Sequence, residues 1–515
     1  MWAPVGQRRR AVLVVAAPDC AEAARRAIEQ AAPGAPYVLV GPDADAGDLT
    51  GIDYDRVAAY GLDDGEALSD ALIRDAFSRR LRWLRRLSDG GALAPYRPWR
   101  ALAGVRPRVL VLFPGSPIPL DKGSNQRAFN LVWHLNRAGI ATDLLLTTAS
   151  RRSLPRLAEL LSAIAPRVFT YRNDKPMLPP RQRARRTVER AYRLAGGAWR
   201  KPPDLFAERL ATRGARDGRR QLGRLVAGGD YDAVIVSFAW MTGLVDAVRP
   251  RVSAAVRWLC DTHDVQFARG ETLNRGQRRL GVSAARERDA ELAALRAYDR
   301  VIAISPSDAD ELARNLGDDR VLLAPTGFDY AVQPLPEAAA RPPFRFGFIG
   351  RAMDANAAAL SLLAHDWWPA IERAAPGSRL LVAGTLCGRA DVRALVAGRT
   401  GIELLGFLPT LADFYRRIDI ALNPVVVQGG LNFKSIEALA AGRLLVTTPM
   451  GARCLGEGAP VAVAETGAEA ARLVRAFADE PERLHEERGR AQTWCREQFS
   501  EQRAYAALRS YLRGP

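Results

Sequence analysis

Residues 344–384 have the sequence FRFGFIGRAMDANAAALSLLAHDWWPAIERAAPGSRLLVAG, and this stretch decides the expected fold. An apolar run at 344–350 is followed at 356–375 by a longer pattern in which apolar residues recur at helical spacing. A second short apolar run follows at 379–384. Short apolar runs that alternate with helical patterns indicate a parallel sheet with crossover helices. The stretch therefore predicts one strand–helix–strand unit of an α/β domain.

Three blocks of this alternation follow one another along the 515 residues. A chain of this length exceeds one compact domain, because domains usually hold ~100–200 residues. We expect an N-terminal α/β accessory region at 1–100, a first large domain at 101–330 and a second at 331–490, followed by a C-terminal helix at 491–515. The predicted fold is α/β, with two Rossmann-like parallel-sheet domains facing a cleft and the additional N-terminal region.

In the first block, apolar runs at 11–18 and 37–42 predict strands, and a helix is expected between them at 21–32. Acidic loops follow, and the stretch AFSRRLRWLRRLSDGG at 76–91 predicts an Arg-rich helix. Nothing in this block indicates a function. In the second and third blocks, strands are expected at 108–115, 142–148, 167–172, 232–238, 256–261, 300–305, 320–327, 344–350, 379–384, 402–408, 420–426, 444–449 and 461–465.

The charge balance favours anionic partners. Lys and Arg number 74 against 57 Asp and Glu, a formal net charge of +17, although an Ala- and Arg-rich composition could account for part of the excess. The densest basic stretch, at 181–201, lies in an insertion at 175–225 and lacks interleaved aromatic residues or zinc-finger spacing. A solvated or membrane-surface helix is expected there, and no nucleic-acid partner.

The five cysteines are scattered, odd in number and free of CxxC spacing, which favours a reducing compartment and predicts no zinc site. The apolar run near the N-terminus is short and meets Pro18, so it predicts a strand rather than a signal peptide. No stretch approaches the ~20 apolar residues of a membrane span. We therefore expect a cytoplasmic protein, with peripheral contact at the inner face of the membrane as an open alternative.

The segment GGLNFKSIEALAAG at 429–442 is the main candidate binding motif. Its glycines let the backbone approach a ligand closely, Lys434 supplies a cation near a helix start, and Glu437 follows on the same helical face. A helix N-terminus with a lysine can bind a diphosphate, and a carboxylate one turn later can accept hydrogen bonds from ribose hydroxyls. An exposed ion pair between Lys434 and Glu437 is the structural alternative.

This segment resembles the signature of the retaining GT-B glycosyltransferases of the large family four, the glycosyl transferases group 1. FIGR at 348–351 resembles the family's turn whose basic residue contacts the donor diphosphate. AISPSDADEL at 303–312 and APTGFD at 324–329 are similar to its segment before the interdomain hinge. The resemblance covers about residues 106–515. It implies donor binding by Arg351, Gly430, Asn432, Lys434 and Glu437.

The stretch PGSPIPLDKGSNQRAFNLVWHL at 114–135 resembles the first loop and helix of exopolysaccharide-type members of this family. In those members the turn faces the donor phosphate and the acceptor. The resemblance implies a phosphate and acceptor loop with backbone contacts from Gly123 and Ser124, and with Asp121, Lys122 and Arg127 lining the turn. Helix capping is the alternative role for Asp121 and Ser124.

His263 and Asp264 follow a predicted strand, in the sequence CDTHDVQFAR at 260–269. A lone histidine is usually structural, but His263 is flanked by carboxylates in a predicted loop, and it resembles the family residue that contacts the donor sugar. We assign His263 and Asp264 as the candidate catalytic pair. A metal site is not favoured, because no second ligand cluster accompanies them. The other three histidines, His134, His365 and His485, lie in helical patterns and are expected to be structural.

The sequence departs from the family pattern at one position. The family commonly has two glutamates eight positions apart, and the position eight before Glu437 is occupied by Gly429. The acid that the family places near the donor sugar is therefore absent, which leaves the donor and the detailed mechanism open.

The resemblance implies transfer of a hexosyl unit from a nucleoside-diphosphate sugar to a glycan or lipid-linked acceptor, in cell-surface polysaccharide synthesis and with retention of configuration. It implies neither a metal nor a cofactor beyond the donor. A sugar-nucleotide epimerase and a non-catalytic protein for glycan binding or complex assembly are the alternatives. A dehydrogenase is not favoured, because no strand is followed by GxGxxG.

Overall fold

The computed structural model describes residues 11–44, 48–49, 52, 54–61, 68–78, 81–120, 122–148, 154–172, 206, 210, 216–268, 284–327, 335, 340–408, 411–427 and 430–514. The chain forms two compact units, which are described separately. Unit 1 comprises Met1–Thr262, Asp289–Val301 and Arg509–Pro515, and unit 2 comprises His263–Arg288 and Ile302–Leu508.

Unit 1 begins with a five-stranded sheet whose strand order is β2-β1-β3-β4-β5. Its strands are β1 (Ala11–Val15), β2 (Tyr37–Val40), β3 (Tyr54–Tyr60), β4 (Trp83–Leu87) and β5 (Leu93–Pro95). The first four strands pair in parallel and β5 is antiparallel. Helix α1 (Ala21–Ala31) buries its apolar stripe against β1, β3 and β4. The expected α/β character of this region is confirmed.

The prediction of an Arg-rich helix at 76–91 is wrong. The helix that precedes it, α2 (Asp70–Ser78), ends at Ser78, and the Arg-rich stretch forms strand β4. Leu81, Leu84 and Leu87 recur every three residues, a helical spacing, but Leu84 and Leu87 are buried within strand β4 and Leu81 is buried just before it. Strand β3, which pairs with β4, lies where only acidic loops were expected. Pairing with a neighbouring strand decided the conformation here, against the local pattern.

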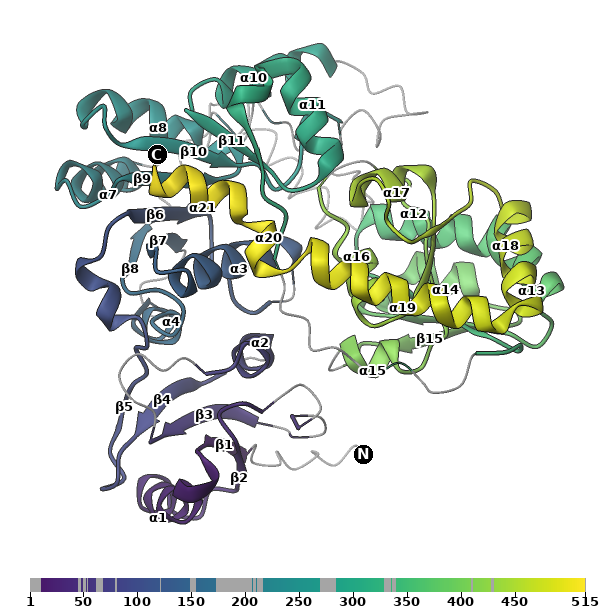
Figure 1. Ribbon diagram of the computed structural model, residues 1–515, viewed down its shortest axis with the longest axis horizontal. Coiled ribbons are helices and arrows are strands. Elements are labelled where there is room, and N and C mark those ends of the chain that lie inside the picture. The colour runs from purple at the N-terminus through teal and green to yellow at the C-terminus, as the bar shows by residue number, and fades with distance from the viewer. Residues whose placement is uncertain are drawn as a thin grey trace, which may run out of the picture. The chain divides into compact units, whose positions relative to one another are not determined.

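Helix α2 joins the first sheet to the rest of unit 1 (Figure 1). The ring of Phe77 packs edge-on against the ring of Phe129, with centroids 5.7 Å apart. The backbone carbonyl oxygen of Phe77 accepts a hydrogen bond of 3.0 Å from the backbone N–H of Leu120. Trp99, in the segment that links the two sheets, packs edge-on against Trp133 with centroids 5.2 Å apart. These buried aromatic contacts make the N-terminal sheet an integral part of unit 1.

The second sheet of unit 1 has parallel strands in the order β10-β9-β6-β7-β8, and β11 and β12 extend it to seven strands. The unit boundary falls within β11. The strands are β6 (Arg108–Phe113), β7 (Ala141–Thr148), β8 (Val168–Arg172), β9 (Ala233–Ser237), β10 (Arg257–Asp261), β11 (Arg300–Ala303) and β12 (Val321–Leu323). The accompanying helices are α3 (Gly123–Arg137), α4 (Leu154–Leu161), α7 (Arg216–Ala227), α8 (Thr242–Val248), α10 (Ala284–Leu295) and α21 (Ala506–Arg513). Every strand expected in this block is present.

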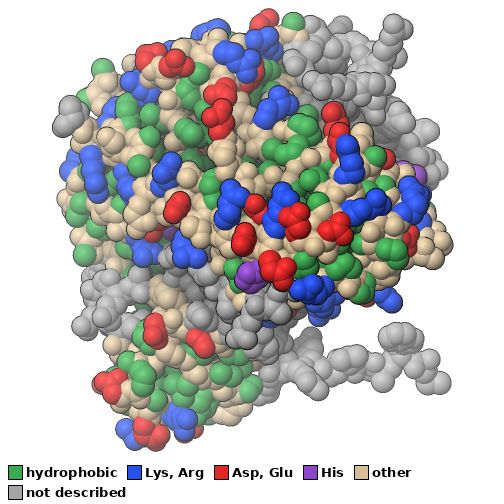
Figure 2. Space-filling model, turned by 45° about the vertical axis from the view of Figure 1, so that its right-hand side comes forward, with side chains coloured by type: hydrophobic (Ala, Val, Ile, Leu, Met, Phe, Trp, Pro, Cys, Tyr) green, Lys and Arg blue, Asp and Glu red, His purple; other side chains and the backbone are tan. Residues whose placement is uncertain are grey.

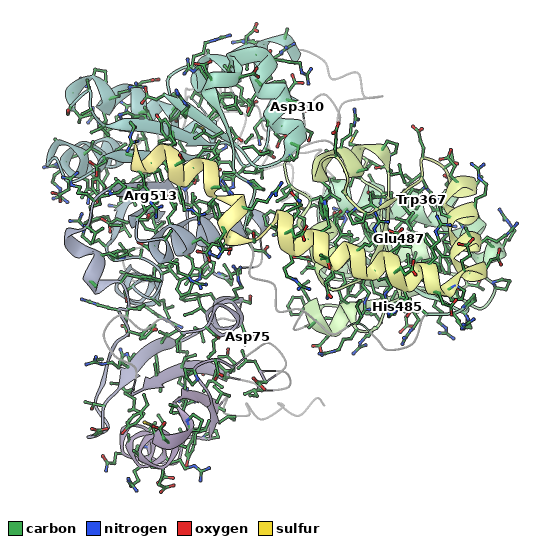
Figure 3. All side chains as sticks on the ribbon, in the orientation of Figure 1. Asp75, Asp310, Trp367, His485, Glu487 and Arg513 are labelled. Atoms are coloured by element: carbon green, nitrogen blue, oxygen red, sulfur yellow. The ribbon has the colours of Figure 1, made fainter. Side chains whose placement is uncertain are left out.

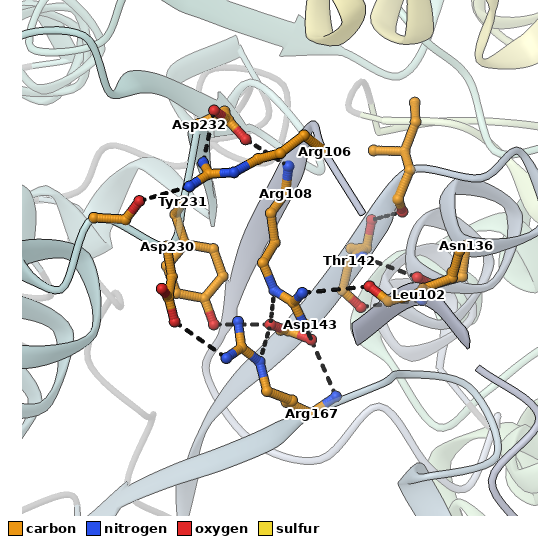
Figure 4. A network of polar contacts seen from close by, with 12 residues as sticks. Leu102, Arg106, Arg108, Asn136, Thr142, Asp143, Arg167, Asp230, Tyr231 and Asp232 are labelled. Atoms are coloured by element: carbon orange, nitrogen blue, oxygen red, sulfur yellow. Dashed lines mark hydrogen bonds and ion pairs between the residues drawn. The ribbon is translucent and has the colours of Figure 1, made fainter. Parts of the chain in front are cut away.

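A buried polar network lies at the amino ends of these strands (Figure 4). The carboxylate of Asp143, which is fully buried, accepts hydrogen bonds from the guanidinium groups of Arg108 at 2.9 and 3.2 Å and of Arg167 at 2.8 Å. The Tyr231 hydroxyl donates to it at 2.9 Å, and burial and the adjacent carboxylate raise the pKa of that hydroxyl. The network joins β6, β7 and the residues that precede β8 and β9, so it fixes how these strands pack.

Unit 2 contains a six-stranded parallel sheet in the order β15-β14-β13-β16-β17-β18. Its strands are β13 (Arg345–Ile349), β14 (Arg379–Ala383), β15 (Ile402–Gly406), β16 (Ile420–Asn423), β17 (Leu444–Thr447) and β18 (Ala462–Val463). Its helices are α11 (Pro306–Leu316), α12 (Asp354–Leu362), α13 (Trp368–Ala374), α14 (Ala390–Val396), α15 (Leu411–Tyr415), α16 (Phe433–Ala440), α17 (Pro449–Leu455), α18 (Gly467–Asp479), α19 (Pro481–Gln498) and α20 (Glu501–Ala504). This is the arrangement predicted for the third block.

The core of unit 2 has two parts, one between this sheet and α15, α16 and α19 and the other between the sheet and α12, α13 and α18. Trp367 is fully buried there, while His485 and Glu487 lie on the long helix α19 (Figure 3). A π-helical turn, Leu363–Trp367, connects α12 to α13. His365 lies in this turn and His134 in α3, so all three histidines expected in helices are helical.

All five cysteines are free thiols. Within the described ranges, no helix is both long and apolar enough to cross a membrane. No group of three or more His, Cys, Asp or Glu side chains in those ranges is arranged to hold a metal ion. On the face shown in Figure 2, basic and acidic side chains are interspersed, so the net positive charge is not gathered there into one patch.

Candidate functional site

The candidate site lies in unit 2, around the start of α16 and the carboxyl end of β13. In parallel α/β sheets, ligands bind outside the carboxyl ends of the strands. The loop before α16 contains Gly430 with φ +64°, a left-handed conformation that favours glycine. Asn432 is the N-cap residue of α16, and its side-chain oxygen accepts a hydrogen bond of 3.2 Å from Asn423 at the end of β16. These contacts fix where the helix begins.

Lys434 lies in the first turn of α16. Its Nζ donates to Oδ1 of Asn356 at 2.9 Å and lies 4.5 Å from the centroid of the Phe348 ring, a cation–π contact. Part of the side chain stays exposed, but burial of the ammonium group lowers its pKa to about 7, against the opposing effect of Glu437. A lysine that is incompletely neutralised by its surroundings is suited to receive an anion.

Glu437 lies one turn further along α16 and interacts with Tyr415 at the end of α15. Burial, the charge of Glu437 and a hydrogen bond to it together raise the pKa of the Tyr415 hydroxyl well above its ordinary value. The same hydroxyl contacts the backbone oxygen of Lys434 at 3.1 Å. Lys434 and Glu437 thus each have a further side-chain partner, Asn356 and Tyr415, besides the attraction between their own charges.

Arg351 is exposed in the turn between β13 and α12. Its backbone oxygen accepts a hydrogen bond of 3.0 Å from the side chain of Asn356, the same residue whose oxygen contacts Lys434. Gly350 and Gly384 let this turn pack closely, since a Cβ on Gly384 would lie 2.2 Å from the Gly350 oxygen. Asn356 therefore connects Lys434 to the backbone of the turn that contains the exposed Arg351.

His263 and Asp264 follow β10 in sequence but belong to unit 2. His263 has φ +62°, a conformation that non-glycine residues adopt at a cost of ~1 kcal/mol and that is concentrated at functional sites. Both side chains are nearly buried, at 7% and 9% exposure, and Gln266 donates a hydrogen bond to Asp264. A Cβ on Gly430 would lie 2.7 Å from the His263 oxygen and 3.4 Å from the Asp264 Cβ. The candidate catalytic pair is thus adjacent to the loop before α16.

The structure therefore brings together seven residues that sequence reasoning had selected at separate positions, namely His263, Asp264, Arg351, Gly430, Asn432, Lys434 and Glu437. It also adds residues that were not selected. Asn356 and Phe348 contact Lys434, Tyr415 contacts Glu437, and Asp308 accepts a hydrogen bond of 3.1 Å from the backbone N–H of Gly430. Asp308 lies in the first turn of α11, where an acidic residue is common at any helix, so its sequence position gave no signal.

The second predicted group lies in unit 1, in the loop before α3. Lys122 is exposed and is the N-cap residue of α3, with no side-chain capping bond, and Gly123 and Ser124 begin the helix. The capping alternative for Ser124 is therefore not observed. Arg127 does not line the turn as expected. Its guanidinium is fully buried and pairs with the Asp261 carboxylate at 3.0 Å, an ion pair between α3 and the end of β10.

Some predicted features fall outside the described residues. These are Asp121 of the predicted phosphate loop, Gln428 and Gly429 at the departure from the family pattern, and residues 181–201 of the basic insertion.

The fold belongs to a class shared with solved glycosyltransferase structures. A sucrose-phosphate synthase from Thermosynechococcus elongatus aligns with a TM-score of 0.56 at 15% identity, over 79% of this chain and 98% of that chain. HepE of Anabaena, in complex with UDP-glucose, aligns with a TM-score of 0.54 at 13% identity, over 79% and 99%. TarM of S. aureus aligns with a TM-score of 0.55 at 9% identity, over 79% and 98%. At these identities the likeness concerns the fold alone, and it is the GT-B arrangement of Rossmann-like parallel sheets.

A sequence match is narrower and more specific. Residues 343–486 match the family model described as Glycosyl transferases group 1. That segment contains Arg351, Asn356, Gly430, Lys434 and Glu437, which are the residues gathered at the start of α16. No curated protein matches the chain.

Proposed function

We propose that the protein is a glycosyltransferase that moves a hexosyl unit from a nucleoside-diphosphate sugar to a glycan or lipid-linked acceptor. The observation that carries this proposal is the environment of Lys434. Its ammonium group is partly desolvated beside Asn356 and Phe348, and Asn356 connects it to the backbone of the turn that contains the exposed Arg351. The match of residues 343–486 to glycosyl transferases supports the same chemistry, and HepE, one of the structural neighbours, is described in complex with UDP-glucose.

In the proposed reaction the bond between the anomeric carbon and the diphosphate oxygen breaks while the acceptor hydroxyl oxygen bonds to that carbon, and the hydroxyl proton is released to the leaving diphosphate or to water. Negative charge then develops on the leaving diphosphate. Arg351, Lys434 and the N-terminal end of α16 would stabilise that charge as preorganised donors, which is electrostatic catalysis. Glu437 would accept hydrogen bonds from the ribose hydroxyls.

His263 and Asp264 would position the donor sugar. The His263 backbone oxygen and the Asp264 Cβ lie against Gly430, next to the helix that would hold the diphosphate, which supports this role. We propose retention of configuration and no requirement for a metal, on the strength of the resemblance in the segment 429–442. A role in cell-surface polysaccharide synthesis is the corresponding proposal for the acceptor.

Donor binding and turnover with a panel of UDP-, GDP- and ADP-sugars would test this proposal. The expected result is saturable stabilisation by one nucleoside diphosphate in the wild type, with affinity reduced about tenfold or more in Lys434→Ala. Lys434→Arg should retain part of the affinity, because it keeps a positive charge. Arg379→Ala is the matched control, since it removes an exposed cation at the start of β14 that pairs with Glu403.

Turnover separates the enzyme from a binding protein. Release of nucleoside diphosphate that depends on an added glycan or lipid-linked acceptor would support transfer. Binding without turnover across acceptors would favour the non-catalytic alternative, and no response to any nucleotide in folded protein would contradict the donor site itself.

A further inference from the structure

Gly430 and Asp308 make a contact that joins two distant parts of unit 2. They are 122 positions apart in sequence, and Oδ2 of Asp308 accepts a hydrogen bond of 3.1 Å from the Gly430 backbone N–H. The Asp308 side chain is 1% exposed. A buried carboxyl group is costly unless its oxygens are hydrogen-bonded, so this bond is the compensation for burying it.

Two segments, 263–264 and 304–308, converge on Gly430. Besides Asp308 on α11, the segment after β10 approaches so closely that a Cβ on Gly430 would lie 2.7 Å from the His263 oxygen. The side chain of Ile304, just before α11, lies 3.5 Å from the same point. Gly430 therefore has almost no room to move on these sides, and the Asp308 bond fixes the direction of its N–H.

Asp308 also has a local role in α11, where its side chain contacts Ser305. The N-cap residue of α11 is Ser305, whose Oγ accepts a hydrogen bond of 3.2 Å from the Asp308 backbone N–H. Asp310, two residues further along the same helix, is exposed (Figure 3). An acidic residue that only interacts with the helix dipole can be exposed to solvent, as Asp310 is. The Asp308 carboxyl group instead points inward, to the loop before α16.

We propose that Asp308 is a positioning residue of the candidate donor site: its carboxyl group holds Gly430 in the left-handed conformation and thereby fixes where α16 begins, with Asn432 as its N-cap and Lys434 in its first turn. The inference rests on the proposed function for its consequence in donor binding. Asp308 acts on the donor only through the Gly430 loop.

The hydrogen bond between Asp308 and Gly430 should depend on pH, because the surroundings of Asp308 shift its pKa. Burial is the main cause that raises the Asp308 pKa to about 7, and Asp264, from the segment after β10, and Glu311, on α11, add to it, while Ser305 and the Gly430 N–H oppose it. On α17, Asp308 in turn raises the pKa of the Cys454 thiol. The ionised carboxylate is the stronger acceptor, so the bond to Gly430 should tighten as pH rises through about 7.

Hydrogen exchange of peptides that contain residues 430–434 tests the positioning role without any ligand. Asp308→Ala should speed exchange in those peptides about tenfold or more, and Asp308→Asn, which keeps an acceptor oxygen of the same shape, should restore much of the protection. Asp310→Ala on the same helix should change nothing there. Exchange that is the same in Asp308→Ala and in wild type would overturn the proposal.

Binding of the nucleoside diphosphate that the wild type recognises tests the link to the donor. Asp308→Ala should raise its Kd about tenfold, and Asp308→Asn less. The ratio of the wild-type Kd to that of Asp308→Asn should fall as pH rises from about 6 to about 8, because the ratio cancels titrations that both proteins share, including that of Lys434. A ratio that does not change with pH would count against control by the Asp308 carboxylate.

The two proposals fail in different ways. If Asp308→Ala loosens the loop while the wild type binds no nucleotide, the proposed function is overturned and the hold of Asp308 on Gly430 is supported. If the wild type binds nucleotide and Asp308→Ala changes neither exchange nor affinity, the donor site stands and the positioning role is overturned.

Discussion

The pKa values of Lys434 and Asp308 are both shifted to about 7, the first downward and the second upward, and burial is the main cause of both shifts. Burial disfavours the charged form of each, which lowers the lysine pKa from 10.5 and raises the aspartic acid pKa from 3.8. Both lie against the loop before α16. Perturbed groups of this kind are concentrated at functional sites, because binding an oppositely charged ligand can reverse the shift.

Diphosphate binding should therefore take up a proton at Lys434. In the free protein its pKa is about 7, so at about pH 8 the amine is mostly neutral. An adjacent diphosphate favours the charged form and raises that pKa, so a proton is taken from the buffer on binding. Titration calorimetry in buffers of different ionisation enthalpy measures this uptake. Lys434→Arg, whose guanidinium stays protonated, should show little, and equal uptake in both proteins would contradict the assignment.

Asp308→Asn should stabilise unit 2 more at high pH than at low pH. The folded pKa of Asp308 is about 7, above the ordinary 3.8, so between these values the folded state binds more protons than the unfolded chain. Stability from this group is full below about pH 4 and is lost as pH rises through about 7. Asparagine does not titrate, so its advantage over wild type should grow toward pH 8, by at most about 4 kcal/mol.

Thermal unfolding of both proteins at about pH 5 and about pH 8 measures this difference. Asp310→Asn, at an exposed position of the same helix, should show no comparable dependence on pH. If the difference in unfolding midpoint between Asp308→Asn and wild type is the same at both pH values, burial does not raise the pKa of the Asp308 carboxyl group.

At the scale of elements, the strands of unit 1 are tied at their amino ends by the network around Asp143. This carboxylate joins side chains from β6, from Arg167 directly before β8 and from Tyr231 two residues before β9, and it has no exposed surface. Breaking a buried ion pair by removing one partner leaves an uncompensated charge, which costs more than the pair itself contributes.

Asp143→Asn should lower the stability of unit 1 by roughly 3–5 kcal/mol, because Arg108 and Arg167 would keep their charges without the carboxylate. Tyr231→Phe should cost about 1 kcal/mol, since it removes one hydrogen bond. Arg26→Gln, which breaks an exposed pair with Glu22 on α1, should cost less than about 1 kcal/mol. Unfolding curves of the three variants give the comparison, and an Asp143→Asn effect as small as that of Arg26→Gln would show that the network is not strongly stabilising.

At the scale of the whole molecule, each unit has its own hydrophobic core. The N-terminal sheet is joined to the rest of unit 1 by buried contacts such as Phe77 against Phe129, so it should unfold with that unit. Unit 2 has a separate core around Trp367 and its neighbours. Two cores of this size predict two cooperative transitions rather than one.

Scanning calorimetry should therefore resolve two transitions that respond to different changes. The nucleoside diphosphate that binds near Lys434 should raise the midpoint of one, and Asp143→Asn should lower the midpoint of the other. A single transition that both changes shift would contradict this assignment and would mean that the units unfold together.

The sequence alone determined the strand–helix alternation and the residues of the donor motif. Runs such as 344–350 and 379–384 are buried on both faces of a parallel sheet, so their apolar composition identifies them without reference to the rest of the chain. Lys434 and Glu437 could be selected because they lie within one short segment, where spacing and family resemblance are both readable from the sequence.

Only the tertiary structure decided which charged groups are buried and what they contact. Arg127 was expected to line a turn but pairs with Asp261, 134 positions away, and Asp308 contacts Gly430 across 122 positions. Strand β4 carries a helical spacing that pairing with β3 overrides. Local patterns report which conformations a segment favours, whereas the burial of a charge and the pairing of a strand depend on residues that only folding brings near.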